Sequence, residues 1–269
     1  MLFNFDSRGS GRITEDSFRF TGRYLFASGN DGSWELALLE SGTLTWLTNP
    51  GRVDLCLVGA GNDGGNGYSN GTWQGAYVYS GSGGDGGRVY SNTAGVTLGT
   101  EIDVVVGAEK GANSSIGSWS SANGQAIKGG RGAEMPQQSN AVGTVNTGGA
   151  DGVWPFGEAA DNTMIPGLQG KRMAPSGGGG HANNRIEYAG NPPYYNYVYT
   201  DEHGGDNEGG ASGAGNGGER SHRNGYDATG IGAGGGGGYG RGESYDGGYG
   251  GKGSQGAVLI RKHKEVTAA

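Results

Sequence analysis

The sequence is poor in several residue types that common classes of protein require. One cysteine, Cys56, stands among 269 residues, so neither an internal disulfide nor a cysteine metal site can form. Only 33% of the residues are hydrophobic, too few for one conventional core in a chain of this length. No stretch approaches the roughly 18 apolar residues of a membrane span, and residues 1–16 contain no long apolar segment of a secretory signal. We therefore expect no membrane insertion and no export by a signal peptide.

Charge and reactive side chains also exclude several functions. The formal net charge is −7, and nucleic-acid binding needs a basic surface. The Gly-Tyr-Gly-Arg-Gly run at 238–242 does not change this, because Glu243 and Asp246 offset its charge. The four histidines are scattered without catalytic or metal-ligand spacing, and we interpret the acidic stretch 201–208 as a solvated loop. We expect no enzyme activity, no cofactor, no metal site and no nucleic-acid partner.

Glycine is abundant, with 64 residues against an average near 7% of a chain. The apolar run 53–58 leads into Gly59-x-Gly61-x-x-Gly64, the spacing of a dinucleotide-binding loop. That loop must be followed by a helix whose N-terminus faces the pyrophosphate. Residues 65–71 instead contain three more glycines, each of which costs a helix about 1 kcal/mol against alanine. We therefore interpret the glycines as structural.

Segments with β-strand character cluster at 17–59, 87–128 and 256–263. In the first cluster, Ser41-Gly42 separates two apolar runs and predicts a hairpin between them. No convincing amphipathic helix is present. The three clusters suffice for one eight-stranded β-sandwich. Because its last strand lies near residue 257, the glycine-rich stretches 60–86 and 129–255 must be insertions into this domain, and residues 1–16 form an N-terminal arm.

The two insertions are expected to be ordered, although glycine-rich segments often behave as flexible linkers. Their glycines come in pairs and runs, such as 177–180 and 234–238, and strands hold both ends of each insertion. Such sequences can form polyglycine-II helices, which have three residues per turn and no internal hydrogen bonds. Neighbouring helices must then satisfy the backbone groups, and backbones approach closely enough only where no Cβ intervenes.

The order of these elements resembles a glycine-rich domain of tailed phages and of the anaplastic lymphoma kinase family ectodomain. The resemblance lies in the run 53–61, the Gly-Gly strand 86–90, the strand 96–107 that ends in glycine, and the last strand 256–261. It implies an all-β fold, a jelly-roll-like β-sandwich with an inserted polyglycine-II helix bundle. It also implies a phage tail adhesin, released by lysis, whose variable loops contact the host. The paired cysteines and kinase parts of the receptor family are missing.

Two aromatic clusters interrupt the insertions and are the predicted receptor-binding sites. The first contains Trp73, Tyr77 and Tyr79; the second contains Tyr188, Tyr194, Tyr195, Tyr197 and Tyr199. Pro192 and Pro193 have no backbone amide to donate to the hydrogen-bonded lattice of neighbouring glycine helices. The second cluster is therefore expected in a loop outside the bundle. Tyrosine with asparagine and glycine is typical of binding loops. The alternative is that these rings cover the glycine lattice.

The sequence thus favours a receptor-binding adhesin at a phage tail fibre or tail tip, located in the virion. Its expected partners are a host cell-surface receptor, either protein or glycan, other tail proteins, and further copies of the chain in a homotrimer. Two alternatives remain open: a structural virion or surface protein without receptor contact, and an ice-binding protein. A regular row of small residues would favour ice binding, but the bulky tyrosines interrupt any such row.

Overall fold

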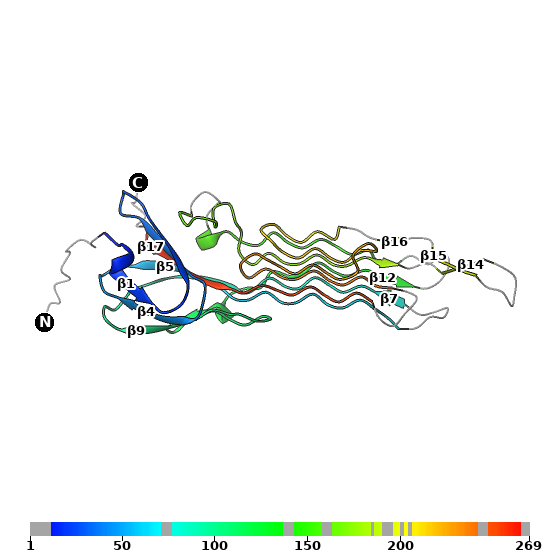
Figure 1. Cartoon of the computed structure of the whole chain (residues 1–269), viewed down its shortest axis with the longest axis horizontal. Coiled ribbons are helices and arrows are strands. Elements are labelled where there is room, and N and C mark those ends of the chain that lie inside the picture. Colours follow the sequence, from blue (N-terminus) through cyan, green and yellow to red (C-terminus); the bar gives the residue numbers. More distant parts are fainter. Residues whose placement is uncertain are drawn as a thin grey trace.

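The structure is a computed structural model that describes residues 12–70, 77–136, 143–157, 163–183, 186–189, 196–199, 202–203, 206–241 and 247–264. The molecule is elongated, with a β-sandwich at one end and a long bundle of extended segments running away from it (Figure 1). Regular structure in the described part is mostly β, with three short 3-10 turns, η1 (Glu15–Ser17), η2 (Ser121–Asn123) and η3 (Pro155–Gly157). The predicted all-β fold is confirmed.

Two five-stranded antiparallel sheets form the sandwich, so it has ten strands where the sequence predicts eight. The first sheet has the order β1-β4-β9-β10-β11 and the second β2-β3-β17-β5-β8. Their bounds are β1 (Phe18–Phe20), β2 (Tyr24–Ser28), β3 (Trp34–Leu38), β4 (Gly42–Trp46), β5 (Val53–Val58), β8 (Val89–Ala94), β9 (Glu101–Val105), β10 (Ser115–Ile116), β11 (Trp119–Ser120) and β17 (Ala257–Lys262).

The core lies between the two sheets, and a smaller core lies behind the second one. Trp34 of β3 meets Trp46 of β4 across the sandwich, with ring centroids 5.3 Å apart. On the opposite face of the second sheet, Cys56 and Val58 pack with Ile165 and Met173 from the connection after η3. Strands β3, β5 and β17 are therefore covered on both faces, which explains why their sequences read as nearly continuous apolar runs.

The last strand lies in the middle of the second sheet, between β3 and β5. Ala257, its first residue, pairs with Val58, the last residue of β5. The chain thus leaves the sheet at Val58 and returns beside it at Ala257. The glycine-rich stretches 60–86 and 129–255 therefore both lie between β5 and β17, two paired strands of this sheet.

The predicted hairpin at Ser41-Gly42 is wrong. Strand β3 pairs with β2 and β17, whereas β4 pairs with β1 and β9 in the other sheet. Residues 39–41 therefore cross from one sheet to the other. Gly42 is needed for close approach, since a Cβ there would lie 2.6 Å from Thr21 Oγ1 and 2.9 Å from the Gly22 amide nitrogen. Sandwich packing, rather than local turn chemistry, sets this connection.

Small sheets lie at the far end of the bundle (Figure 1). One has the order β12-β7-β6, and two others pair β13 with β16 and β14 with β15. Their bounds are β6 (Tyr68–Ser69), β7 (Tyr77–Tyr79), β12 (Glu134–Pro136), β13 (Ala182–Asn183), β14 (Ile186–Ala189), β15 (Asn196–Tyr199) and β16 (Glu202–His203). These strands define the tip of the molecule.

The glycine-rich segments between the sandwich and the tip bond sideways with a period of three residues. In segment 234–240, every third backbone amide donates to the same neighbouring segment. Gly234, Gly237 and Gly240 donate to the carbonyls of Pro175, Gly178 and His181. The amides between them donate in turn to segments 62–65 and 223–226. A β-strand has a period of two, whereas the polyglycine-II prediction requires a period of three.

Segment 234–240 lies at the centre of this lattice. Besides donating in three directions, its carbonyls accept hydrogen bonds from three further segments. The donors include the amides of Gly84, Gly218 and Gly251, which bond to Gly235, Gly237 and Gly236. Residues 234–238 are all buried. The backbone of this run is in direct contact with neighbouring segments, because a Cβ on any of its glycines would overlap a carbonyl oxygen of another segment.

At the lattice edge, side chains replace missing carbonyl partners. The outer segment 247–256 uses every third amide to bond inward, and its other amides at 249–253 donate to asparagine and aspartate side chains on both flanks. The pairs are Tyr249 with Asn224 (2.9 Å), Gly250 with Asn66 (2.9 Å), Lys252 with Asp227 (2.6 Å) and Gly253 with Asp63 (3.0 Å). Each flank places its two acceptors three residues apart, so the Asx spacing repeats the lattice period.

Removing one of these acceptors should destabilise the lattice edge. Asp227→Ala leaves the Lys252 amide without its partner, and we expect a loss of about 1 kcal/mol in the free energy of unfolding. Asp227→Asn keeps an oxygen in place and should stay near the wild type. Urea melts measure the loss, and hydrogen exchange should show faster exchange at Lys252 in the alanine variant alone. Equal exchange in both variants would contradict the assigned role.

The lattice also settles what the Gly59-x-Gly61-x-x-Gly64 spacing does. No helix follows it in the described residues 59–70. The amides of Gly59, Gly61 and Gly64 donate to the carbonyls of Arg88, Ser254 and Gly251 at 2.8–2.9 Å. A pyrophosphate would need such amides free, so the structural interpretation of these glycines is confirmed.

Candidate binding surface at the tip of the bundle

Some of the predicted receptor-binding residues lie among the described residues, and others lie outside them. Tyr77 and Tyr79 lie on β7, whereas Trp73, Tyr194 and Tyr195 lie outside the described residues. Tyr188, Tyr197 and Tyr199 lie on the paired strands β14 and β15, with Tyr188 opposite Tyr197 and Ile186 opposite Tyr199. The prediction that this second cluster forms a loop is wrong for these three residues, because strand pairing orders their backbone.

The sheet β12-β7-β6 has one buried and one exposed face. Val78 and Met135 point into a small core with Ala133 and Ala182, which closes the end of the bundle. Strand alternation places Tyr77 and Tyr79 on the opposite face, where Tyr79 is paired across the strands with Tyr68 and Glu134. The apolar side therefore anchors the sheet to the lattice, and the tyrosine side faces solvent.

Three tyrosines stack in a row on the exposed face, which we call the tyrosine stripe (Tyr68, Tyr79 and Tyr77). The Tyr68 and Tyr79 ring centroids lie 4.8 Å apart at 18°, and those of Tyr79 and Tyr77 lie 6.0 Å apart at 29°. Tyr68 is 49% exposed and Tyr77 is 37% exposed. Mutual stacking limits the motion of the rings, so the stripe is a preorganised aromatic surface.

Sequence reasoning missed Tyr68 and Glu134 as members of this surface. Tyr68 stands alone in a glycine-rich stretch, and Glu134 is more than 50 residues from β7 in the chain. Strand pairing brings both beside Tyr79. Partial burial and then the charge of exposed Glu134 raise the pKa of Tyr79, which keeps its hydroxyl protonated as a donor. The stripe thus combines apolar ring surface with hydroxyl groups and one carboxylate.

A second polar cluster lies in the sandwich, around Asp54 of β5. His263 Nδ1 lies 2.7 Å from Asp54 Oδ1, Arg261 Nε lies 3.3 Å from Asp54 Oδ2, and Thr93 donates to Asp54 Oδ1 at 2.8 Å. Arg261 is also paired across the strands with buried Glu35. Thr93 bonds to the carboxylate rather than to the imidazole, so the cluster does not form a nucleophile–histidine pair. It ties β17 to β5 and β8.

The ionisation of this cluster couples stability to pH. Burial raises the pKa of Glu35, against the opposing effects of the Met164 amide and Arg261. For Asp54, burial would raise the pKa, but the hydrogen bonds from His263 and Thr93 and the charges of His263 and Arg261 lower it overall. Asp54 therefore stabilises the fold above its unfolded pKa, and this contribution is lost as the pH falls through its lower folded pKa.

Glu35 has the opposite sign, because the folded state binds its proton more tightly than the unfolded state does. Stability from this group should rise as the pH falls from neutrality through the raised pKa towards about 4.5. Glu35→Gln keeps an acceptor for the Met164 amide, which donates to Glu35 Oε2 at 2.8 Å, and should remove that rise. Urea melts between pH 7 and pH 4.5 measure it, and an unchanged pH dependence in the variant would contradict this assignment.

The described residues contain neither a cluster of metal ligands nor a helix able to span a membrane. Among those residues, no three His, Cys, Asp or Glu side chains gather closely enough to hold a metal ion. No helix in the same ranges has the length and hydrophobicity needed to cross a bilayer.

The fold and the lattice define a glycine-rich β protein, and sequence comparison agrees. The model of the glycine-rich domain family matches residues 39–263, which include most of the sandwich and the whole bundle. The chain belongs to this glycine-rich domain family. No curated protein and no solved structure shows a significant match to it.

Proposed function

We propose that the protein is a receptor-binding adhesin at a phage tail fibre or tail tip, and that the tyrosine stripe contacts the host surface. The observation that carries this proposal is the position of the stripe. Its three stacked, partly exposed tyrosines belong to β6 and β7, and β7 lies at the end of the bundle far from the sandwich (Figure 1). Clustered exposed aromatic rings on a folded protein tend to mark interaction sites.

We infer that the lattice segments are polyglycine-II helices and that the bundle is a stiff spacer. The period of three in the hydrogen bonds of segment 234–240 supports this inference. Bonds in several directions join each central segment to others distant in the chain, so bending one segment would strain its neighbours. A stiff spacer holds the tip away from the sandwich, which leaves the sandwich free to attach to other tail proteins or to further copies in a homotrimer. The jelly-roll likeness of the sandwich stays a prediction.

The chemistry of the stripe suits a glycan or a protein loop as receptor. Ring faces and edges offer apolar contact at low entropic cost, while the tyrosine hydroxyls and Glu134 can bond to hydroxyl or amide groups. The hairpin β14–β15 lies at the same end of the molecule (Figure 1). Its tyrosines, together with Trp73, Tyr194 and Tyr195, remain proposed contacts.

Two other functions predict different results. An ice-binding face needs a flat row of small residues, but every third residue exposed along segment 249–255 is bulky: Tyr249, Lys252 and Gln255. A structural virion protein would not need an exposed tip.

Electron microscopy of particles labelled with an antibody against the sandwich tests the proposal. We expect label near the far end of a tail fibre or at the tail tip, and purified protein should compete with phage for adsorption. Label on the capsid, or no competition, would refute the proposal.

A further inference from the structure

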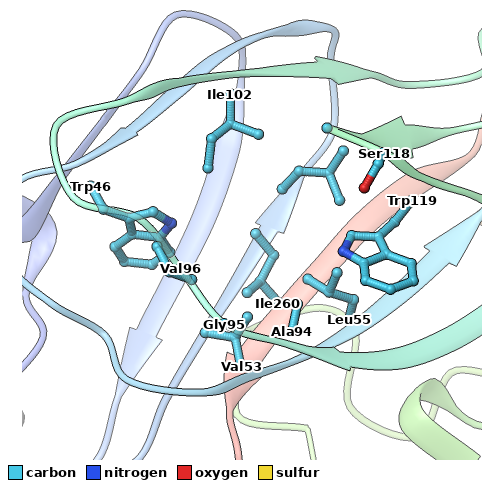
Figure 2. A pocket seen from close by; sticks show the side chains of 12 residues that line it. Trp46, Val53, Leu55, Ala94, Gly95, Val96, Ile102, Ser118, Trp119 and Ile260 are labelled. Atoms are coloured by element: carbon cyan, nitrogen blue, oxygen red, sulfur yellow. The ribbon is translucent and has the colours of Figure 1, made fainter. Parts of the chain in front are cut away.

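A pocket opens between the two sheets of the sandwich, at the edge opposite β1 and β2. It has a volume of about 150 Å³ and is lined by residues from both sheets. Figure 2 shows Trp46 and Trp119 on opposite sides of it, with Leu55 and Ile260 between them. This pocket lies in the sandwich, away from the tyrosine stripe, so binding there would be independent of the proposed function.

The pocket has a fixed floor and an accessible mouth. Trp46, Val53, Leu55 and Ile260 form its buried floor, each no more than 3% exposed. At the mouth, Gly95, Gly117 and Ser118 are exposed, and Val96 and Trp119 are half-buried. The segment 94–96 crosses from the end of β8 towards the other sheet here, and its central residue is a glycine with no atom within 4 Å of where a Cβ would stand. Entry from solvent is thus open.

The lining is suited to an apolar occupant and poorly suited to water. Its side chains carry no charged group, and the polar ones belong to Ser118 and the two indoles. The backbone groups of β5 are bonded to β17 on one side and to β8 on the other. A buried water needs two to four polar partners, whereas an apolar cavity of about this volume in another protein stays dry and binds benzene. Two tryptophan rings add faces and edges for aromatic contact.

We propose that this pocket is a binding site for an uncharged aromatic group of one or two rings. The group would enter between segment 94–96 and the turn at 117–118, and it would pack between Trp46 and Trp119. The same chemistry could be presented by a free small molecule or by an aromatic side chain of another protein, and the experiment separates these two sources.

Indole is the probe, and thermal melting of the full chain is the measurement. At about 10 mM indole, we expect the wild-type Tm to rise by about 3 °C, as for a ligand of millimolar affinity. Ala94→Leu places three more carbon atoms in the pocket and should abolish the shift. Ala122→Leu adds the same atoms at an exposed position of η2 and should leave the shift unchanged. No shift in the wild type, or equal shifts in both variants, would overturn the proposal.

A second variant covers the case in which Ala94→Leu fails to fold. Val96→Phe changes a half-buried residue at the mouth, where a larger side chain disturbs the packing of the core less. This variant should also remove the indole shift. N-acetyl-tryptophanamide then identifies the source, because its ring is attached to a backbone. A shift with both compounds indicates that the pocket accepts a side chain of another protein. A shift with indole alone indicates a free small molecule. Persistence of the indole shift in Val96→Phe would contradict the assigned entrance.

Discussion

Replacing Tyr68 and Tyr77 together by alanine should weaken binding of the purified protein to host cells by about a thousandfold, with little change in Tm. These two rings form the outer members of the tyrosine stripe and are its most exposed members. An aromatic anchor at an interface often contributes 2 kcal/mol or more, and two such losses, if additive, amount to roughly a thousandfold in affinity. Titration of labelled protein onto cells gives the affinity.

The melting temperature separates this role from packing. The lattice does not depend on these rings, because the buried face of the same sheet, with Val78 and Met135, provides the anchoring contacts. Tyr249→Ala is the matched control, since Tyr249 is 68% exposed on the outer segment 247–256 and is not a member of the stripe, so its loss should not affect binding. A lower Tm in the double variant with unchanged binding would mean that the stripe only covers the lattice.

Gly236→Ala should be among the most damaging single substitutions in the chain, with a loss of about 3 kcal/mol. A Cβ on Gly236 would overlap the carbonyl of Asn216 and lie 3.0 Å from the amide nitrogen of Gly217. Both are backbone atoms of an adjacent lattice segment and cannot rotate away, so the segments must move apart. About three hydrogen bonds around this point would then weaken, at about 1 kcal/mol net each.

Gly95→Ala is the control for this prediction. Gly95 has no positive φ, and a Cβ there would meet no atom within 4 Å. The same added methyl group should therefore change the free energy of unfolding by no more than about 0.5 kcal/mol. Denaturant melts of both variants measure the difference. Equal, small losses in the two proteins would show that the lattice is looser than its hydrogen bonds indicate.

The connections of the sandwich show where local reasoning from sequence fails. The apolar runs 34–38 and 53–58 and the returning strand near 257 were predictable, because strands buried on both faces must be apolar along their whole length. The partner of each strand was not. Ser41-Gly42 has hairpin composition, yet the chain changes sheets there, because β3 pairs with β2 and β17 in one sheet and β4 pairs with β1 and β9 in the other.

For the glycine lattice and the tip of the bundle, too, some features follow from the sequence and others only from the tertiary structure. Sequence alone predicted that the insertions are ordered and that their backbones pack closely, because only residues without Cβ allow amides and carbonyls to meet in several directions. The role of the Asx pairs at the edge became apparent only in the structure. Only the tertiary structure decided which side chains meet. Tyr68, Tyr79 and Glu134 form one surface, and Trp46 and Trp119 enclose one pocket, through contacts between segments far apart in the chain. The spacing of residues along a sequence does not encode the register between such segments. That register is set only when the lattice segments and the strands pack against each other.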